Sequence, residues 1–560
     1  MSARWPWVAV FAVTCAALIF VLAGLPARAV RMEETIGSSL GRRTTTFVTG
    51  AVHVHTTLSD GAASIDEVAS AAARADLQFV VITDHGDGTR PPGPPSYRSG
   101  VLVIDAVEIS AYGGHYVAVD LPQAPYPIAG EARDVVEDVR RLGGFGITAH
   151  GTSPKSDLAW HDWTLPIDAI EWLNLDTEWR TRTAAQIARA FLGYFLRPPE
   201  ALGSLLARPA ELLNRWDEIS RSRRVVSIAA TDCHTSTLPS YEACFRAITT
   251  RVELVSALSG RADADGRALV AALRAGHHYS SVDALAVGAR FDFTATQTGR
   301  VAHEGDLLPA GAPVAFEARV DAPPGAELIL LKNGSAVAES RASRLTFTAG
   351  DDPAAYRIEA RLPAGRSSQS VPWIVSNPIY VGIPAAAVEN APQPAGSGRA
   401  LHAFWAVERD DASRANVDRD PATVGGEGFL LRYALGQGPP ADQFVAMVAP
   451  VDGLAAYGAL TVTARASRPM RVGVQLRPAG RDNPPRWQRS VYLDRSTRTV
   501  TVRFDDMHPV PRSVSGPAPL PTIGAILFVI DTNNTSPGSS GEITVRDVTL
   551  GKSDDQRRDL

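Results

Sequence analysis

Short apolar runs that end at histidine or aspartate are the feature that most constrains the fold of this chain. Between Thr46 and Ser281 such runs alternate with helical stretches, and two of them read Phe-Val-Val-Ile-Thr-Asp84-His85 and Phe-Gly-Ile-Thr-Ala-His150. Alternation of strands and helices is typical of βα units. Residues that follow such strands meet at one edge of a sheet or barrel, so they are expected to lie close together.

The alternation predicts seven strands and five helices. The strands are expected at 47–54, 79–83, 101–107, 116–119, 145–149, 169–173 and 225–230, and the helices at 64–75, 131–142, 183–196, 209–221 and 265–275. Ser64 with Glu67 three residues later has capping-box spacing, and Pro209 suits the first position of its helix. Seven strands in this order predict an α/β domain over 46–283, a closed or nearly closed TIM-like (β/α) barrel.

Two all-β sandwich domains are predicted after the barrel. Residues 285–383 carry short alternating runs separated by Pro, Gly and Asn333-Gly334 turns, which favours an immunoglobulin-like sandwich. A linker at 384–398, rich in Ala, Pro and Gly, leads to 399–552, where the alternation predicts a jelly-roll, galactose-binding-like sandwich. Trp373, Trp405 and Trp487 suggest glycan stacking, with burial in the two cores as the alternative.

The N-terminal segment 1–29 predicts export. Arg4 precedes an apolar run at 5–25 that ends in Ala27-Arg28-Ala29, the small-x-small pattern found before a signal-peptidase cut. The run also reaches the roughly 20 residues that a membrane helix needs, so an uncleaved membrane anchor is the alternative to a periplasmic or extracellular protein. In an oxidising compartment Cys233 and Cys244 could pair, and two buried thiols are an equal alternative.

The composition limits which ligands the chain can bind and which side chains could hold a metal. The net charge of −5 arises from 55 basic and 60 acidic residues without long one-sign runs, which argues against nucleic-acid binding. Nine of the 12 histidines lie between His53 and His278, whereas the chain has only three cysteines. A metal site would therefore use imidazole and carboxylate rather than sulfur.

Nine side chains of metal-ligand type lie at or just after the predicted strands. They are His53, His55, Asp60, His85, Glu108, His115, His150, Asp232 and His234. Residues two apart in a strand share one face, so His53 and His55 are expected to point to the same mouth. A catalytic zinc typically takes three protein ligands, so this set suffices for two or three divalent ions with a bridging carboxylate.

These residues, in this order, resemble a known family. The motifs His53-x-His55-Thr-x-x-Ser-Asp60-Gly, Thr-Asp84-His85, Glu108 with His115, His150, and Asp232-x-His234 are similar to those of the PHP (polymerase and histidinol phosphatase) superfamily of metal-dependent hydrolases. The helical insertion before Asp232 and the ending Leu-Arg-Ala-Gly-His277-His278-Tyr resemble the CehA/McbA branch, which includes carbamate hydrolases. Ala229-Ala230-Thr231 stands where glycines are more usual, a departure that touches no ligand.

The resemblance implies a distorted (β/α)7 barrel and a ligand assignment. By that resemblance the first ion is held by His53, His55, Glu108 and Asp232; the second by Glu108, His115 and His150; and the third by Asp60, His85 and His234. The ions are zinc, manganese or iron, and the sequence leaves the identity open. Asp84 is expected to orient a ligand histidine through its other ring nitrogen, and Glu171 and Asn174, near the end of the sixth strand, are further candidates for such support. The expected catalytic residues are Glu108, Asp232, His150 and Asp84.

The predicted reaction is hydrolysis of a small-molecule phosphomonoester or phosphodiester, with a metal-bridging hydroxide as nucleophile. Carboxyl-ester or carbamate hydrolysis at the same metals is one alternative. A non-catalytic envelope protein whose β domains bind glycans is another, and the complete ligand set argues against it.

Overall fold

The computed structural model describes residues 5–24, 28–31, 46–235, 238–288, 290–363, 371–386, 398–421, 428–438, 443–480, 484–511 and 513–552. The chain divides into two compact units, the first of Met1–Pro122 with Glu131–Ala387 and the second of Gln123–Gly130 with Val388–Leu560. Most of the predicted linker, 387–397, lies outside the described residues. Within the described parts of the chain, no helix combines the length and the hydropathy of a membrane span. The fate of the segment 1–29 stays a prediction.

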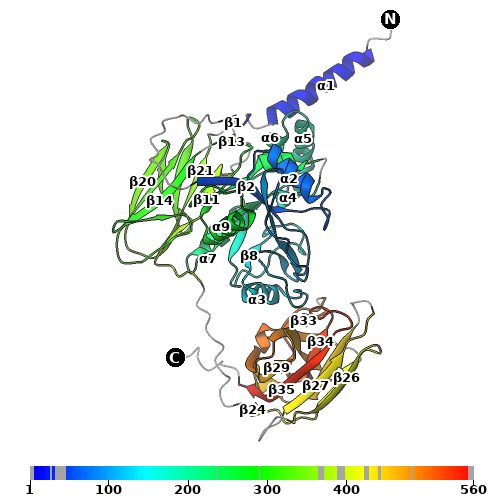
Figure 1. The fold of residues 1–560 in the computed structure, drawn as a ribbon. Helices are drawn as coiled ribbons and strands as arrows, with labels where there is room; N and C mark the ends of the chain where they lie inside the picture. The colour runs from blue at the N-terminus through cyan, green and yellow to red at the C-terminus, as the bar shows by residue number, and fades with distance from the viewer. Residues whose placement is uncertain are drawn as a thin grey trace. The chain divides into compact units, whose positions relative to one another are not determined.

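The α-helices of the described residues all belong to the first unit (Figure 1). They are α1 (Trp5–Gly24), α2 (Ile65–Arg74), α3 (Ala132–Leu142), α4 (Leu175–Arg180), α5 (Ala184–Tyr194), α6 (Pro198–Gly203), α7 (Ala210–Ser220), α8 (Tyr241–Ala247) and α9 (Ala262–Ala275). The capping box of Ser64 and Glu67 is confirmed. Pro209 is the N-cap of α7 rather than its first helical residue, because the helical conformation begins at Ala210.

All seven predicted strands form, but in two sheets. The first contains β2 (Thr46–Val54), β3 (Phe79–Ile82) and β5 (Val101–Asp105), with β4 (Ser96–Arg98), β11 (Thr249–Leu254) and β12 (His278–Ser281) beside them. The second contains β6 (Val107–Ala111), β7 (Gly114–Val119), β8 (Phe145–Thr148), β9 (Ala169–Asn174) and β10 (Val226–Ala230). Backbone hydrogen bonds join the sheets at both edges: Ala106 N donates to Ile82 O at 2.8 Å, and Thr231 N donates to Val52 O at 3.1 Å.

The resulting ring is not a regular (β/α) barrel. Strand β7 runs antiparallel to both β6 and β8, whereas the predicted (β/α) barrel implied parallel strands. The reason is a tight turn at Gly113 and Gly114, whose φ angles of 103° and 126° are unfavourable for other residues, so the chain reverses without a crossover helix.

The predicted sandwich 285–383 shares a sheet with the ring, because β12 pairs with β22 (Ile374–Ser376). That layer also holds β16 (Leu307–Leu308), β18 (Glu327–Lys332), β19 (Ser335–Ser340), β21 (Ala354–Arg361) and β23 (Ile379–Val381), and the facing sheet holds β14 (Phe291–Gln297), β15 (Arg300–His303), β17 (Val314–Val320) and β20 (Arg344–Ala349). The short strands β1 (Val30–Arg31) and β13 (Ala286–Val287) pair separately. Asn333 and Gly334, both at positive φ, form the predicted hairpin turn.

The second unit is a β-sandwich, as the alternation predicted. One sheet contains β24 (Arg399–Ala400), β26 (Arg414–Arg419), β27 (Gly428–Ala434), β29 (Ala459–Ala466), β32 (Arg498–Arg503) and β35 (Ser540–Gly551), and the other β25 (Ala406–Arg409), β28 (Phe444–Pro450), β30 (Met470–Pro478), β31 (Arg486–Leu493), β33 (His508–Val510) and β34 (Ile523–Asp531). The suggestion of glycan stacking fails for the three tryptophans that prompted it, because Trp373, Trp405 and Trp487 are buried.

Candidate metal centre

Glu108 lies at the centre of the predicted ligand set and is fully buried. Its Oε2 atom faces three ring nitrogens: His53 Nε2 at 3.1 Å, His55 Nε2 at 3.1 Å and His85 Nδ1 at 3.4 Å. Its Oε1 atom faces two others: His115 Nδ1 at 2.8 Å and His150 Nε2 at 3.0 Å. One carboxylate therefore divides its two oxygens between two groups of imidazoles, as a bridging ligand must.

Asp232, just after β10, is a second shared carboxylate. Its Oδ1 atom lies 3.3 Å from His53 Nε2 and 3.4 Å from His55 Nε2, while its Oδ2 atom lies 3.2 Å from His150 Nδ1. The sequence placed Asp232 with the first ion only. Its two oxygens instead reach imidazoles assigned to both the first and the second ion.

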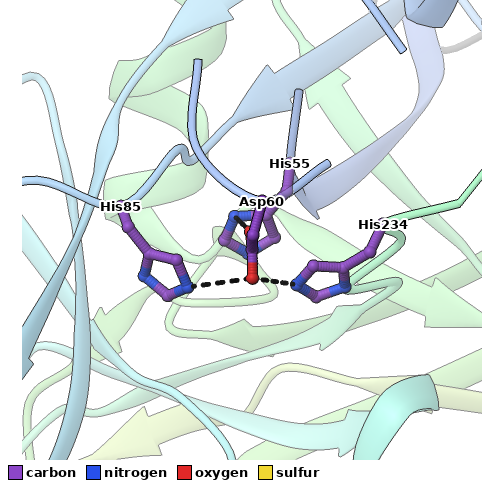
Figure 2. Close-up of side chains that lie close together, drawn as sticks. All are labelled: His55, Asp60, His85 and His234. Atoms are coloured by element: carbon purple, nitrogen blue, oxygen red, sulfur yellow. Dashed lines mark ion pairs between the residues drawn. The ribbon is translucent and has the colours of Figure 1, made fainter. Parts of the chain in front are cut away.

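Asp60, His85 and His234 form the outer part of the centre, together with His55 (Figure 2). Asp60 Oδ2 lies 3.6 Å from His85 Nε2 and 3.5 Å from His234 Nε2, and Asp60 Oδ1 lies 3.4 Å from His55 Nδ1. The side chains of Asp60, His85 and His234 are 54%, 32% and 27% exposed, whereas that of His55 is fully buried. The centre thus has a buried interior and one side open to solvent.

Three ligand positions have unusual backbone geometry. The φ angles of His53, His150 and Asp232 are 67°, 52° and 47°. A non-glycine residue in such a region costs on the order of 1–3 kcal/mol, and such residues gather at functional sites. At His53 the register between β2 and β3 shifts, so simple strand alternation does not place His53 and His55 on one face. A bulge, which sequence periodicity cannot reveal, brings their Nε2 atoms together at 3.1 Å.

His115 directly precedes the strand predicted at 116–119, but it lies within β7, opposite Ser110 of β6. Because β7 runs antiparallel to β8, its amino end meets the carboxyl end of β8, where His150 follows. The direction of β7 therefore brings His115 to the other ligands.

Electrostatics keep the carboxylates of the centre ionised. Burial opposes ionisation of Glu108, but the neighbouring His53 and hydrogen bonds from His115 and His150 hold the pKa of Glu108 well below its usual range. Burial would lower the pKa of His55, yet the nearby carboxylates of Asp232 and Glu108 raise that pKa to about 9. The pKa of His150 is likewise raised to about 9, against burial, by Asp232 and Glu108. The negative charge of these carboxylates is balanced either by protons on the imidazoles or by bound cations, which would displace those protons.

The donor set fits divalent metal ions. His53 Nε2 and His55 Nε2 face each other at 3.1 Å, an arrangement that suits two lone pairs directed at one cation. Among the described residues, His85 Nδ1, His150 Nδ1 and Asp232 Oδ1 are buried atoms that make no hydrogen bond. An unsatisfied buried polar atom costs about 1–3 kcal/mol, and coordination would remove that cost. Nitrogen and oxygen donors suit zinc, manganese and iron.

Asp84 has a different role from the predicted one. Its carboxylate accepts hydrogen bonds from Thr56 N at 2.7 Å, Thr56 Oγ1 at 2.6 Å and Ser59 Oγ at 2.6 Å. These bonds use the carboxylate to fix the 55–60 loop rather than to orient a ring nitrogen. Asp84 therefore supports the ligand Asp60 through the backbone that carries it.

Glu171 of β9 makes the contact that was expected of Asp84. Its Oε1 atom accepts from His53 Nδ1, and its Oε2 atom accepts from His150 N at 3.1 Å and from Asn174 Nδ2 at 2.8 Å. Asn174 Nδ2 also donates to Asp232 Oδ2 at 3.3 Å. The only sequence signal for this pair was a position near the end of the sixth strand.

The two histidines of the ending Leu-Arg-Ala-Gly-His277-His278-Tyr lie outside the centre. His277 pairs with Asp306 at 3.2 Å, and His278 is buried with its Nε2 atom 3.0 Å from Ser227 O.

A cavity of about 150 Å³ adjoins the open side of the centre, lined in part by Leu58, His85 and Arg90. Arg90 forms a two-bond ion pair with Asp105 at 2.8 Å and was not singled out by its sequence context.

Comparisons with known proteins give distant structural neighbours. No family model matches the chain, and no curated protein matches it. A two-domain Bacteroides vulgatus protein containing a predicted PHP-like metal-dependent phosphoesterase is 14% identical, with 60% of this chain and 96% of that chain covered and a TM-score of 0.28. A family 11 carbohydrate-binding module of a Clostridium thermocellum cellulase is 16% identical, with coverages of 29% and 97% and a TM-score of 0.24. TM-scores this low carry no assignment, so function is argued from the site.

Proposed function

We propose that this chain is a metal-dependent hydrolase of the PHP type, acting on small phosphomonoesters or phosphodiesters. The observation that carries the proposal is the position of Glu108, whose Oε1 and Oε2 atoms face two separate groups of imidazoles. A carboxylate buried among five histidines is costly unless cations share its charge. Two ions bridged by one carboxylate are the usual means of clamping an in-line displacement at phosphorus.

Two or three divalent ions, when bound, would lower the pKa of a water from about 15.7 to about 7 and neutralise charge on the leaving oxygen. The residues of the protein have different roles according to how deeply they are buried in the centre. Glu108 and Asp232, whose oxygens lie 3.0 and 3.2 Å from ring nitrogens of His150, would hold the buried ions together with that histidine, and Glu171 fixes the ring of His53 through its Nδ1 atom. The partly exposed Asp60, by contrast, leaves the outer side accessible to a substrate.

The cavity beside His85 supports a small anionic substrate. Arg90 lines it, and the Asp105 carboxylate holds that guanidinium in place with two bonds at 2.8 Å. A guanidinium that lines the same cavity as His85 can contact a phosphoryl oxygen of a substrate bound there, through an N–H that Asp105 does not use. This arrangement favours phosphate esters over uncharged carboxyl esters or carbamates.

The test is a substrate panel with measured metal content. We expect protein loaded with manganese or zinc to hydrolyse an aryl phosphomonoester or phosphodiester faster than naphthyl carbamate. Glu108→Gln keeps the size of the side chain but removes its charge, so it should lose metal and turnover together. Glu242→Gln is a matched control, because Glu242 is partly exposed and its carboxylate pairs with Arg74 at a distance of 2.8 Å. Carbamate turnover alone would assign the alternative reaction, and full activity of Glu108→Gln would refute the bridging role.

Export and glycan contact are further parts of the proposal. The pattern Ala27-Arg28-Ala29 supports cleavage after residue 29 and a periplasmic or extracellular location. Intact mass of the protein recovered from the periplasm should show loss of residues 1–29, and recovery at full length in the membrane fraction would favour the anchor. Retardation of the full chain in gels containing mixed-linked glucan would test glycan contact by the β-sandwiches.

A further inference from the structure

Two cysteines meet directly behind the metal centre. The sulfur atoms of Cys233 and Cys244 lie 2.9 Å apart, and both residues are buried. A disulfide requires an S–S distance of about 2.05 Å, so closing the bond would need a movement below about 1 Å. The chain has only three cysteines, and the third, Cys15, lies in the N-terminal helix α1.

The position of Cys233 connects this pair to metal ligation. Cys233 stands between Asp232 and His234, and its carbonyl accepts a hydrogen bond from His55 N at 3.2 Å. A shift of the Cys233 backbone would therefore displace an aspartate and a histidine of the centre, and it would also weaken the hydrogen bond to the loop that begins at His55.

Cys244 lies on an element that already braces the same loop. It belongs to α8, whose first residue, Tyr241, donates from its hydroxyl to His55 O at 2.7 Å. Ser240 caps this helix by accepting from Ala243 N at 3.2 Å. A bond from Cys244 to Cys233 would give the Asp232–His234 segment a covalent attachment to the buried face of a capped helix.

We propose that Cys233 and Cys244 form a disulfide that clamps Asp232 and His234 in their ligating positions. The thiolate of one cysteine attacks a donor disulfide, such as oxidised glutathione or a protein disulfide, and releases one donor thiolate. The second cysteine's thiolate then attacks the mixed disulfide and releases the other. The two cysteines lose two electrons to the donor, and their protons end on the two donor thiols. Because both sulfurs are buried in the folded chain, this exchange belongs to folding, and the finished bond is shielded from reductants.

Bond formation is tested independently of metal. The full chain is folded with oxidised glutathione and then denatured. One sample is reduced before alkylation with iodoacetamide and the other is not, and the intact mass of each is measured. We expect two more alkyl groups in the reduced sample, whether or not Cys15 is retained, and a protease fragment linking Cys233 to Cys244. Equal alkylation in the two samples overturns the proposal.

The clamp rests on the proposed metal function and has its own readout. In Cys244→Ser the transfer of bound zinc to a chromophoric chelator should be about tenfold faster than in the wild type, in the range seen when support of metal ligands is lost. Cys15→Ser, in the chain that retains residues 1–29, is the matched control and should release zinc at the wild-type rate. A wild-type rate in folded Cys244→Ser overturns the clamp, while a chain that binds no zinc refutes the metal function and leaves the mass result standing.

Discussion

Replacement of Glu171 by glutamine is the sharpest test of how the centre is supported. In the native chain Glu171 Oε1 accepts from His53 Nδ1, while its Oε2 atom accepts from His150 N and Asn174 Nδ2. A glutamine has one acceptor oxygen, so either His53 loses its acceptor or an amide N–H₂ faces two donors. The loss of such support typically weakens metal affinity 10- to 100-fold, which equals about 1.4–2.7 kcal/mol.

The assay is competition for zinc or manganese with a chromophoric chelator, followed by turnover as metal is added. We expect Glu171→Gln to bind metal 10- to 100-fold more weakly and to recover turnover at raised metal concentration, because the ligands themselves remain. Glu178→Gln is the matched control, since Glu178 is a buried glutamate whose carboxylate accepts from Arg182 and from Ala207 N at 3.0 Å. Wild-type metal affinity in Glu171→Gln, with an unchanged Tm, would refute the role of Glu171.

Three further predictions concern stability. Asp84→Ala leaves three donors without their acceptor and should lower the free energy of unfolding by about 3 kcal/mol in urea titration; an unchanged midpoint would contradict this. Burial lowers the pKa of His278 from 6.5 to about 4, so its neutral form is favoured in the folded state. The neutral form of His278 therefore contributes about 3 kcal/mol to the free energy of unfolding above pH 6.5, and this contribution is lost as the pH falls towards 4. In His278→Gln the free energy of unfolding should change less with pH over this window. Arg357→Met leaves the buried Asp217 unpaired and should cost about 3–5 kcal/mol, measured as a fall in Tm; a Tm equal to wild type would refute the importance of this pair.

The sequence located the strands of the ring and the residues that follow them. Apolar runs, capping residues and the Asn333-Gly334 turn are local signals, and each depends on a few neighbouring residues. These signals predicted that His150 directly follows a buried strand, and in the structure the corresponding strand, β8, ends at Thr148. The two β-sandwiches were predicted for the same reason, since strand alternation is also local.

The tertiary structure decided the details that control the chemistry. The bulge at His53 arises from pairing between β2 and β3, and β7 reverses because two glycines replace a crossover. Glu171 carries no motif, and its contact with His53 exists only because the ring of strands brings β9 and β2 together at the centre. The sequence by itself therefore determined which side chains of metal-ligand type the chain presents. Long-range strand pairing, which no local pattern encodes, decided which of them share Glu108 and which residues hold them in place.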